Sequence, residues 1–169
     1  FLALGKKIKI SVLFAQNSED QIFEGIITNK LLELNVTGPT LTIELSDMAI
    51  KMTSTRNNAV FNEKSDSDII KQLVGTHDLK LPNPTSIATT ELKHAQMIQY
   101  YTTDWDFMVA RAEANAQLVN CSDGEITVAK PVIKAKADLT FELGLNSIYD
   151  FDLKIDSVNQ YEKVKAIGW

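Results

Sequence analysis

Paired aspartates are the residues of this chain whose type and spacing best suit catalysis. Asp104 and Asp106 form one pair, and Asp150 and Asp152 form another. Two carboxyl groups that flank a glycosidic bond can act as general acid and as base or nucleophile. However, Asp104 and Asp106 fall at an expected helix start, where the helix dipole favours negative charge. Asp150 and Asp152 share one face of an expected strand, which predicts a solvated face instead of a catalytic pair.

The two histidines and the single cysteine offer little for a metal site or a nucleophile. His77 and His94 each stand alone in the sequence, outside any HExxH-like spacing, so we expect surface histidines and no metal site. Cys121 has no histidine near it in the sequence. No G-x-S-x-G elbow, G-x-G-x-x-G loop or Walker A segment occurs. The residues therefore predict no enzyme, no catalytic residue and no cofactor.

Four aromatic residues near the middle of the chain allow two interpretations. Tyr100, Tyr101, Trp105 and Phe107 would suit a platform on which a ligand stacks. At strand and helix spacing, however, aromatic side chains more often belong to a hydrophobic core. We therefore expect core positions, and in particular a buried Trp105.

The composition sets the class of protein. With 169 residues, 44% hydrophobic and 23% charged, the chain has the make-up of an ordinary globular protein. The net charge of −5, with no basic run, argues against a nucleic-acid partner. The chain opens on Phe1 without an initiator Met and ends on Trp169 directly after an expected strand, from which we expect a piece of a longer protein.

The first third of the chain predicts antiparallel strands. Residues 7–12, 21–29 and 40–47 alternate between apolar and polar side chains. Gly25 interrupts the second of these strands and marks a bulge or a close approach of the backbone. Short strands separated by turn residues are typical of a barrel or a sandwich.

The middle third adds two helices. Ser65 or Ser67 can cap the first, with Gly75 as a stop. After a strand over 97–101, Thr103 can cap the second helix and form a capping box with Asp106.

The second helix has one expected apolar stripe and a defined end. Trp105, Met108, Val109 and Ala112 recur at helical spacing. We expect the helix to end near Asn115, a residue that tolerates the left-handed cap conformation.

Strand patterns return after the second helix. Asp123-Gly124 predicts a hairpin between 117–121 and 125–129. Segments 138–143, 148–155 and 161–169 alternate again. The order is β, then α+β, then β, without a repeat of fixed period, and the predicted fold class is α+β, mainly β.

The order of several short motifs resembles one protein family over most of the chain. Gly5–Ile10 resembles its G-x-x-I-x-I entry strand, and Ile22–Ile27, with Phe23 and Gly25, its F-x-G-x-I strand. The most specific match comprises Gln99, Tyr100, Thr103, Asp104, Trp105, Asp106, Phe107, Arg111, Glu113 and Asn115. These motifs resemble the Rhs-element Vgr (VgrG) family of type VI secretion spike proteins and, more distantly, late control protein D, the baseplate hub of phage tails. Ala116 departs from the glycine that the family pattern places after Asn115.

The resemblance implies a structural hub. Residues 1–55 would belong to a first β-barrel, 56–130 to an α+β insertion, and 131–169 to the start of a second barrel. Such a protein forms a homotrimer that adapts the ring of inner-tube proteins to a trimeric spike with its tip and effectors. It would assemble in the bacterial cytoplasm and be injected with the machine tip.

Two other functions remain open from the sequence. A prophage tail hub of the late control protein D type would differ from a secretion spike by its neighbouring genes. A carbohydrate-binding β-module would use the aromatic residues and the acid pairs. None of these interpretations includes a nucleic-acid partner. For the hub interpretations, the resemblance supplies no catalytic, cofactor-binding or metal residue and no small-molecule substrate.

Overall fold

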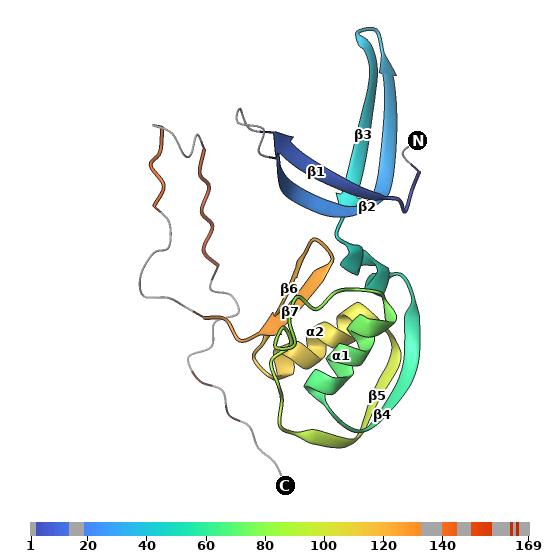
Figure 1. The fold of residues 1–169 in the computed structure, drawn as a ribbon, viewed down its shortest axis with the longest axis vertical. Coiled ribbons are helices and arrows are strands. Elements are labelled where there is room, and N and C mark those ends of the chain that lie inside the picture. Colours follow the sequence, from blue (N-terminus) through green and yellow to red (C-terminus); the bar gives the residue numbers. More distant parts are fainter. Residues whose placement is uncertain are drawn as a thin grey trace. The chain divides into compact units, whose positions relative to one another are not determined.

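The computed structural model describes residues 3–13, 19–132, 140–144, 150–156, 163 and 165. It separates into two compact units, residues 1–132 and residues 133–169. The elements of the first unit, shown in Figure 1, are β1 (Lys7–Leu13), β2 (Glu19–Asn35), β3 (Gly38–Ser46), η1 (Met48–Thr53), β4 (Arg56–Ser65), α1 (Asp66–Thr76), β5 (Lys93–Thr103), α2 (Asp104–Ala114), β6 (Leu118–Ser122) and β7 (Glu125–Ala129). This composition confirms the α+β, mainly β fold class.

An antiparallel sheet in the order β1-β2-β3 opens the chain. Its three strands are those that the alternating sequence predicts. β1 pairs with the first part of β2, and β3 pairs with the second part, so β2 and β3 continue past β1 as a two-stranded arm (Figure 1). One face of this arm carries Leu32, Leu34 and Leu41, and all three side chains are exposed.

Gly25 lies where the first sheet leaves no room for a side chain. A Cβ built on it would overlap the carbonyl oxygen of Ser46 and come within 2.6 Å of the Phe23 ring. The register shifts of β2 fall elsewhere, opposite Ile10–Ser11 and between Ile27 and Asn29. Of the two alternatives for Gly25, the close backbone approach is therefore the one observed.

The hydrophobic core lies in the next segment of the chain. α1 and α2 lie side by side against the curved, antiparallel β4–β5 ribbon, and β6 and β7 complete this part (Figure 1). Phe61 of β4 and Phe107 of α2 stack with ring centroids 5.9 Å apart. The buried core side chains are Ala49, Met52, Phe61, Ile69, Ile70, Leu73, Val74, Leu79, Ile87, Phe107, Met108, Ala112, Ile126 and Val128.

Strand β4 is absent from the predictions made from sequence. Three asparagines lie within it, and asparagine disfavours strands. Only Phe61 and Ser65 of its ten residues are buried, so the alternation that signals a strand is weak. Pairing with β5 and packing against α1 stabilise this strand, although its local strand propensity is weak.

The β4–α1 and β5–α2 segments repeat one another, although the sequence shows no fixed period. Thr103 stands 38 positions after Ser65, and each is the N-cap of its helix. At the same offset, Glu63 and Tyr101 both have positive φ, as do Asp78 and Ala116 after the helices. The sequence does not show this structural repeat, because the shared features are backbone conformations and caps that different side chains satisfy.

Both helix starts follow the predicted caps. Ser65, not Ser67, caps α1 and forms a capping box with Asp68. Thr103 Oγ1 accepts a hydrogen bond from the Asp106 backbone N–H at 3.1 Å and donates one to its carboxylate at 2.7 Å. Among the described residues, the second half of that box, a bond from the Thr103 N–H to Asp106, is not made.

The helix ends differ from the predictions. α1 runs through Gly75 to Thr76, and no heavy atom outside its own helix lies within 4 Å of a Cβ built on Gly75. α2 ends where expected, but Asn115 has a φ of −105° and Ala116 adopts the left-handed conformation, with a φ of 53°. The prediction that Asn115 would take the left-handed position is therefore wrong. The chain places this conformation one residue later, after the helix has used Asn115 as its C-cap.

The β6–β7 hairpin is the one that Asp-Gly predicts. Asp123 and Gly124 both have positive φ, as a two-residue type I′ turn requires. Asp123 also accepts a hydrogen bond from the Glu24 N–H, and the Gly124 N–H donates one to Asp47. The turn therefore links the hairpin to two segments that are distant in sequence.

The strands predicted over 138–143, 148–155 and 161–169 lie partly or wholly outside the described residues. In the second unit, Phe141, Leu143, Phe151, Leu153 and Ile155 are exposed. The three-domain division at about residues 55 and 130 stays a prediction. Neither α1 nor α2, the two α-helices of the described part, has the length and apolarity needed to cross a membrane.

Candidate functional site

The motif around α2 builds a buried polar cluster at the start of the helix. The first residue of α2, Asp104, is 5% exposed. Its carboxylate accepts hydrogen bonds from Asn57 Nδ2 at 2.9 Å and Gln99 Nε2 at 2.8 Å. His77 Nε2 lies 2.6 Å from the other oxygen and donates to it, because an ionised carboxylate can only accept. One carboxylate thus joins β4, β5, the end of α1 and the start of α2.

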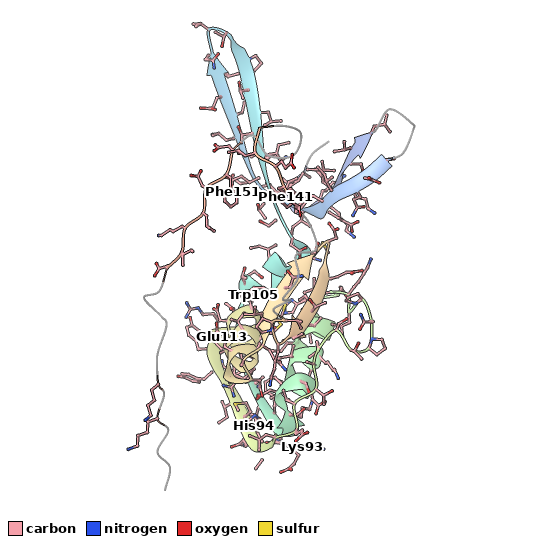
Figure 2. The ribbon with its side chains drawn as sticks, turned by 90° about the vertical axis from the view of Figure 1, so that its left-hand side faces the viewer. Lys93, His94, Trp105, Glu113, Phe141 and Phe151 are labelled. Carbon is pink, nitrogen blue, oxygen red and sulfur yellow. The ribbon has the colours of Figure 1, made fainter. Side chains whose placement is uncertain are left out.

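A second cluster occupies the equivalent place at the start of α1. Asp66 is also 5% exposed and lies 3.0 Å from His94 Nε2 of β5. Its other oxygen accepts a hydrogen bond from Asn115 Nδ2 at 2.9 Å, and Arg111 Nη1 lies 3.6 Å from the carboxylate. Figure 2 labels His94 and Trp105, which lie in different parts of the segment formed by the two helices and the β4–β5 ribbon.

The two clusters connect the antiparallel helices reciprocally. His77, the C-cap of α1, bonds the first residue of α2, and Asn115, the C-cap of α2, bonds the first residue of α1. The prediction of surface histidines is therefore wrong, since both rings are mostly buried and paired. Sequence spacing gave no sign of this because each aspartate lies 27 or 28 positions from its histidine.

The charge of Asp104 is stabilised by its neighbours. Burial alone would raise the pKa of the carboxyl group, but the hydrogen bonds from Asn57, Gln99 and His77 outweigh it and hold the pKa below its usual range. Asp104 is therefore ionised at neutral pH and acts as a fixed acceptor. This suits a structural anchor better than a general acid.

The apolar stripe of α2 is rotated from the one predicted. Phe107, Met108 and Ala112 are buried, whereas Trp105 and Val109 are only partly buried. The prediction of a fully buried Trp105 is therefore wrong, because buried Asp104 turns toward the core at the first turn and moves the tryptophan to its border. The indole still packs against the core cluster.

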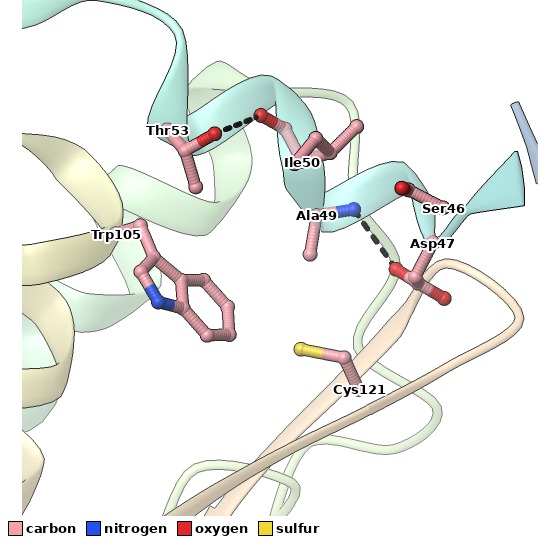
Figure 3. Close-up of a pocket in the computed structure, with 7 residues that line it drawn as sticks. All are labelled: Ser46, Asp47, Ala49, Ile50, Thr53, Trp105 and Cys121. Carbon is pink, nitrogen blue, oxygen red and sulfur yellow. Dashed lines mark hydrogen bonds between the residues drawn. The ribbon is translucent and has the colours of Figure 1, made fainter. Parts of the chain in front are cut away.

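A hollow lies on each side of Trp105. The first, shown in Figure 3, has a volume of about 310 Å³ and lies between Trp105, Cys121 and the η1 segment. The second, of about 280 Å³, is lined by Trp105, Val109, Gln117 and Val119 among others. Both are mainly apolar, so the tryptophan forms a partition between two small apolar recesses.

The remaining motif residues are distributed over the surface. Tyr100 is 82% exposed and Tyr101 61% exposed, so the prediction that these two belong to the core is wrong. β5 pairs with β4 alone in the described structure, and one face of this ribbon is not covered by the helices. The guanidinium of Arg56 lies 5.2 Å from the Tyr101 ring centroid, a cation–π contact. Glu113 is exposed.

In the first sheet, the motif residues Phe23 and Gly25 flank Glu24, a buried carboxylate that pairs with two exposed lysines. Glu24 accepts from Lys7 and lies 2.8 Å from Lys9 Nζ. Hydrogen bonds from Lys7 and then Lys9 lower the pKa of Glu24 to about 2. The motif here secures strand pairing, and sequence reasoning did not identify the ion cluster that it surrounds.

The other groups tested for chemistry are not arranged for it. Burial raises the pKa of the Cys121 thiol to about 11, so the nucleophilic thiolate is scarce at neutral pH. The Asp106 carboxylate accepts a hydrogen bond from the N-cap Thr103, and Asp150 and Asp152 are exposed, as a solvated face predicts. In the part of the chain that the structure describes, no group of three or more His, Cys, Asp or Glu residues could hold a metal ion.

A family model describes the whole sequence. Residues 1–169 match the model of the Alg8 N-terminal domain. The chain belongs to the Alg8 N-terminal domain family. No curated protein sequence matches it. The family match leaves membership of the VgrG family without confirmation.

Solved structures show which fold this family member has. A prophage MuSo2 43 kDa tail protein from Shewanella oneidensis has a TM-score of 0.57 with it at 13% identity, over 82% of this chain and 48% of that protein. A tail protein from Neisseria meningitidis MC58 has a TM-score of 0.49 at 16% identity, over 64% of this chain and 34% of that one. The similarity to the Shewanella protein shows that this Alg8 N-terminal domain has a phage tail protein fold. The chain spans about half the length of that protein.

Proposed function

We propose that this chain is part of the baseplate hub of a phage-tail-like contractile injection machine. In this role it would join an inner tube to a trimeric puncturing spike. The single observation that carries the proposal is the fold shared with the Shewanella prophage tail protein over most of this chain. The hub assignment within the tail rests on the motif order along the sequence.

The clusters around α1 and α2 suit a protein that must transmit force without unfolding. Asp66 and Asp104 are buried, and each connects a helix start to the end of the other helix through partly buried hydrogen bonds. Buried hydrogen-bonded charges are costly to separate, so this arrangement resists shear between the two helices. The two clusters therefore suit a structural role, because each fixes a helix start to the end of the other helix.

Two machines fit this role. The prophage tail hub of the late control protein D type is favoured by the origin of the Shewanella structure, a prophage. The VgrG spike of a type VI secretion system is favoured by the residues from Gln99 to Asn115 that resemble its motif. In either case we expect a homotrimer that contacts the tube ring and spike tip, assembled in the bacterial cytoplasm and injected afterwards.

A carbohydrate-binding module is supported less well. Sugar rings stack on open aromatic faces, whereas the Trp105 indole packs against the core cluster. Tyr100 is open, but in the described part of the chain no carboxylate of the two acid pairs forms a hydrogen bond with it. We therefore expect no sugar binding that depends on Trp105.

Locating the protein within assembled particles tests the hub proposal. Tail-like particles would be purified from a strain that carries the gene, and the protein would be labelled by a specific antibody for electron microscopy. We expect label at one end of the inner tube and no assembled particles from a gene-deletion strain. Particles that assemble normally without the protein, or label along the whole sheath, would contradict the proposal.

A further inference from the structure

The outer edge of β6 has free backbone hydrogen-bonding groups. On the other side of the hairpin, Ile126 and Val128 of β7 bond to the loop over residues 80–88. Their N–H and C=O groups therefore point away from β6. In an antiparallel ladder, the residues opposite them, Cys121 and Val119, must then point their own N–H and C=O groups to the outer edge. In the described part of the chain, no hydrogen bond from another segment reaches these groups.

The two hollows lie along this edge. Cys121 lines the hollow on one side of Trp105, and Val119 lines the hollow on the other side. These two residues are two positions apart in a strand, which corresponds to about 7 Å. A strand added at the edge would place alternate side chains opposite Val119 and Cys121, on the same face of the sheet. The spacing of the hollows thus matches the side-chain period of an extended segment.

Gln117 provides a second, independent sign of a missing partner. Its side chain is 4% exposed and lines the hollow beside Val119. Its Nε2 is within 3.4 Å of the Ala88 carbonyl oxygen, but its Oε1 is buried with no hydrogen-bond donor in the described structure. Buried polar atoms without a partner are rare and costly, and Gln99 Oε1 is the other one in the described structure.

The charge around the hollows limits what can bind there. The first hollow is lined by Asp47 and the second by Glu113, and neither lining includes Lys, Arg or His. A segment with basic ends would therefore bind more readily than an acidic one. A segment such as 150–156, with its three aspartates, is therefore disfavoured at this edge.

The geometry points to the β6 edge as a docking site for an extended segment of a different protein. That segment would have apolar side chains at two alternate positions, which enter the hollows beside Trp105, and basic residues on either side of them. It would bind by adding a strand to β6, a known mode of peptide recognition. The argument for this docking site is the same whether the chain belongs to a prophage tail or to a type VI secretion spike.

A synthetic peptide tests this site directly. The probe is acetyl-Lys-Thr-Val-Thr-Val-Lys-amide, with parallel peptides in which both valines are Ile, Leu or Phe. The protein would carry Trp169→Phe, which leaves Trp105 as its sole tryptophan. We expect saturable changes in Trp105 fluorescence with a dissociation constant below about 1 mM, and NMR shifts at the Val119 and Cys121 amides.

Backbone methylation of the peptide provides a matched control that leaves the protein unchanged. Methylating the two valine nitrogens removes the donors that would face β6 and should weaken binding about tenfold or more. Methylating the two threonine nitrogens, which would face away, should weaken it much less. A peptide with Glu in place of both Lys should bind more weakly than the probe.

Protein variants complete the test. Val119→Pro removes an outward N–H without removing a β6–β7 hydrogen bond, and should abolish binding. Asn120→Ala, on the opposite face of the hairpin, should leave binding unchanged. No binding by any peptide at about 1 mM, or equal binding after valine methylation, would overturn the proposal. Self-association that Val119→Pro abolishes would make a second copy the occupant and would also overturn it.

Discussion

Replacing Asp104 with alanine tests the buried cluster that joins the two helices. The change removes the acceptor of three donors, Asn57 Nδ2, Gln99 Nε2 and His77 Nε2. Gln99 Nε2 keeps its other hydrogen bond, to the Thr102 carbonyl oxygen at 3.1 Å. Gln99 is only 1% exposed, so its lost hydrogen bond to a charged group should cost about 2–3 kcal/mol. The other two donors are partly exposed and can rehydrate, so together they should add about 1–2 kcal/mol.

We therefore expect Asp104→Ala to lower the free energy of unfolding by about 3–5 kcal/mol, as for a broken buried pair. Urea denaturation at pH 7, followed by circular dichroism, measures this quantity. Asp106→Ala is the matched control, because Asp106 is an exposed helix-start acid two positions away; its loss should cost about 1 kcal/mol or less. A cost for Asp104→Ala no larger than that of Asp106→Ala would refute the anchoring role.

The pH dependence supplies an independent check of the same residue. Because the folded-state pKa of Asp104 is below its unfolded value, its ionised form stabilises the fold above that unfolded value. This contribution is lost as the pH falls from about 4 through the folded-state pKa. Asp104→Asn keeps the shape but cannot ionise, so the stability difference between it and the wild type should shrink on acidification below pH about 4. A difference that stays constant between neutral and acidic pH would contradict this assignment.

Five further substitutions test the packing, two of them expected to stabilise the protein and three to destabilise it. Ala116→Gly should stabilise the protein by about 0.5–1 kcal/mol in thermal or urea unfolding, because glycine relieves the left-handed backbone at 116; a loss of stability would contradict this. Gly25→Ala should cost about 3 kcal/mol or prevent folding through overlap with Ser46, whereas Gly75→Ala, a matched change in α1, should stabilise by about 0.5–1 kcal/mol; equal effects would be inconsistent with the packing described. Phe107→Ala should cost about 3–5 kcal/mol and Trp105→Ala less, since only Phe107 is buried, and the reverse order would show that the stripe is wrongly placed.

Local signals allowed much of the fold to be predicted. Thr103 and Ser65 cap helices, and Asp123-Gly124 makes a tight turn, because each effect acts between residues that are close in sequence. The first three strands alternate clearly and were found for the same reason. Gly25 was predicted to mark either a bulge or a close approach of the backbone. The Ser46 carbonyl oxygen beside it shows that it is a close approach.

The missed features depend on contacts between distant parts of the chain. His77 and His94 look isolated in the sequence, yet each meets an aspartate from another element. β4 has weak strand propensity and forms because β5 pairs with it. The open edge of β6 can be recognised only once the partners of β7 are known, since its own five residues do not differ from those of an ordinary hairpin strand.

The rotation of α2 shows how one polar residue can change a core prediction. Periodicity placed Trp105 inward because it recurs with Met108, Val109 and Ala112 at helical spacing. The buried partners of Asp104 draw that side chain inward, and Phe107 then takes the central core position beside Phe61. The same rotation places Trp105 between the two hollows at the edge of β6.

The oligomeric state of the complete gene product tests the hub proposal most directly. Light scattering coupled to size-exclusion chromatography, over a range of protein concentrations, would give its mass in solution. The proposal predicts a homotrimer, as a hub that joins a tube to a three-fold spike requires. A complete gene product that stays monomeric at every concentration would contradict it.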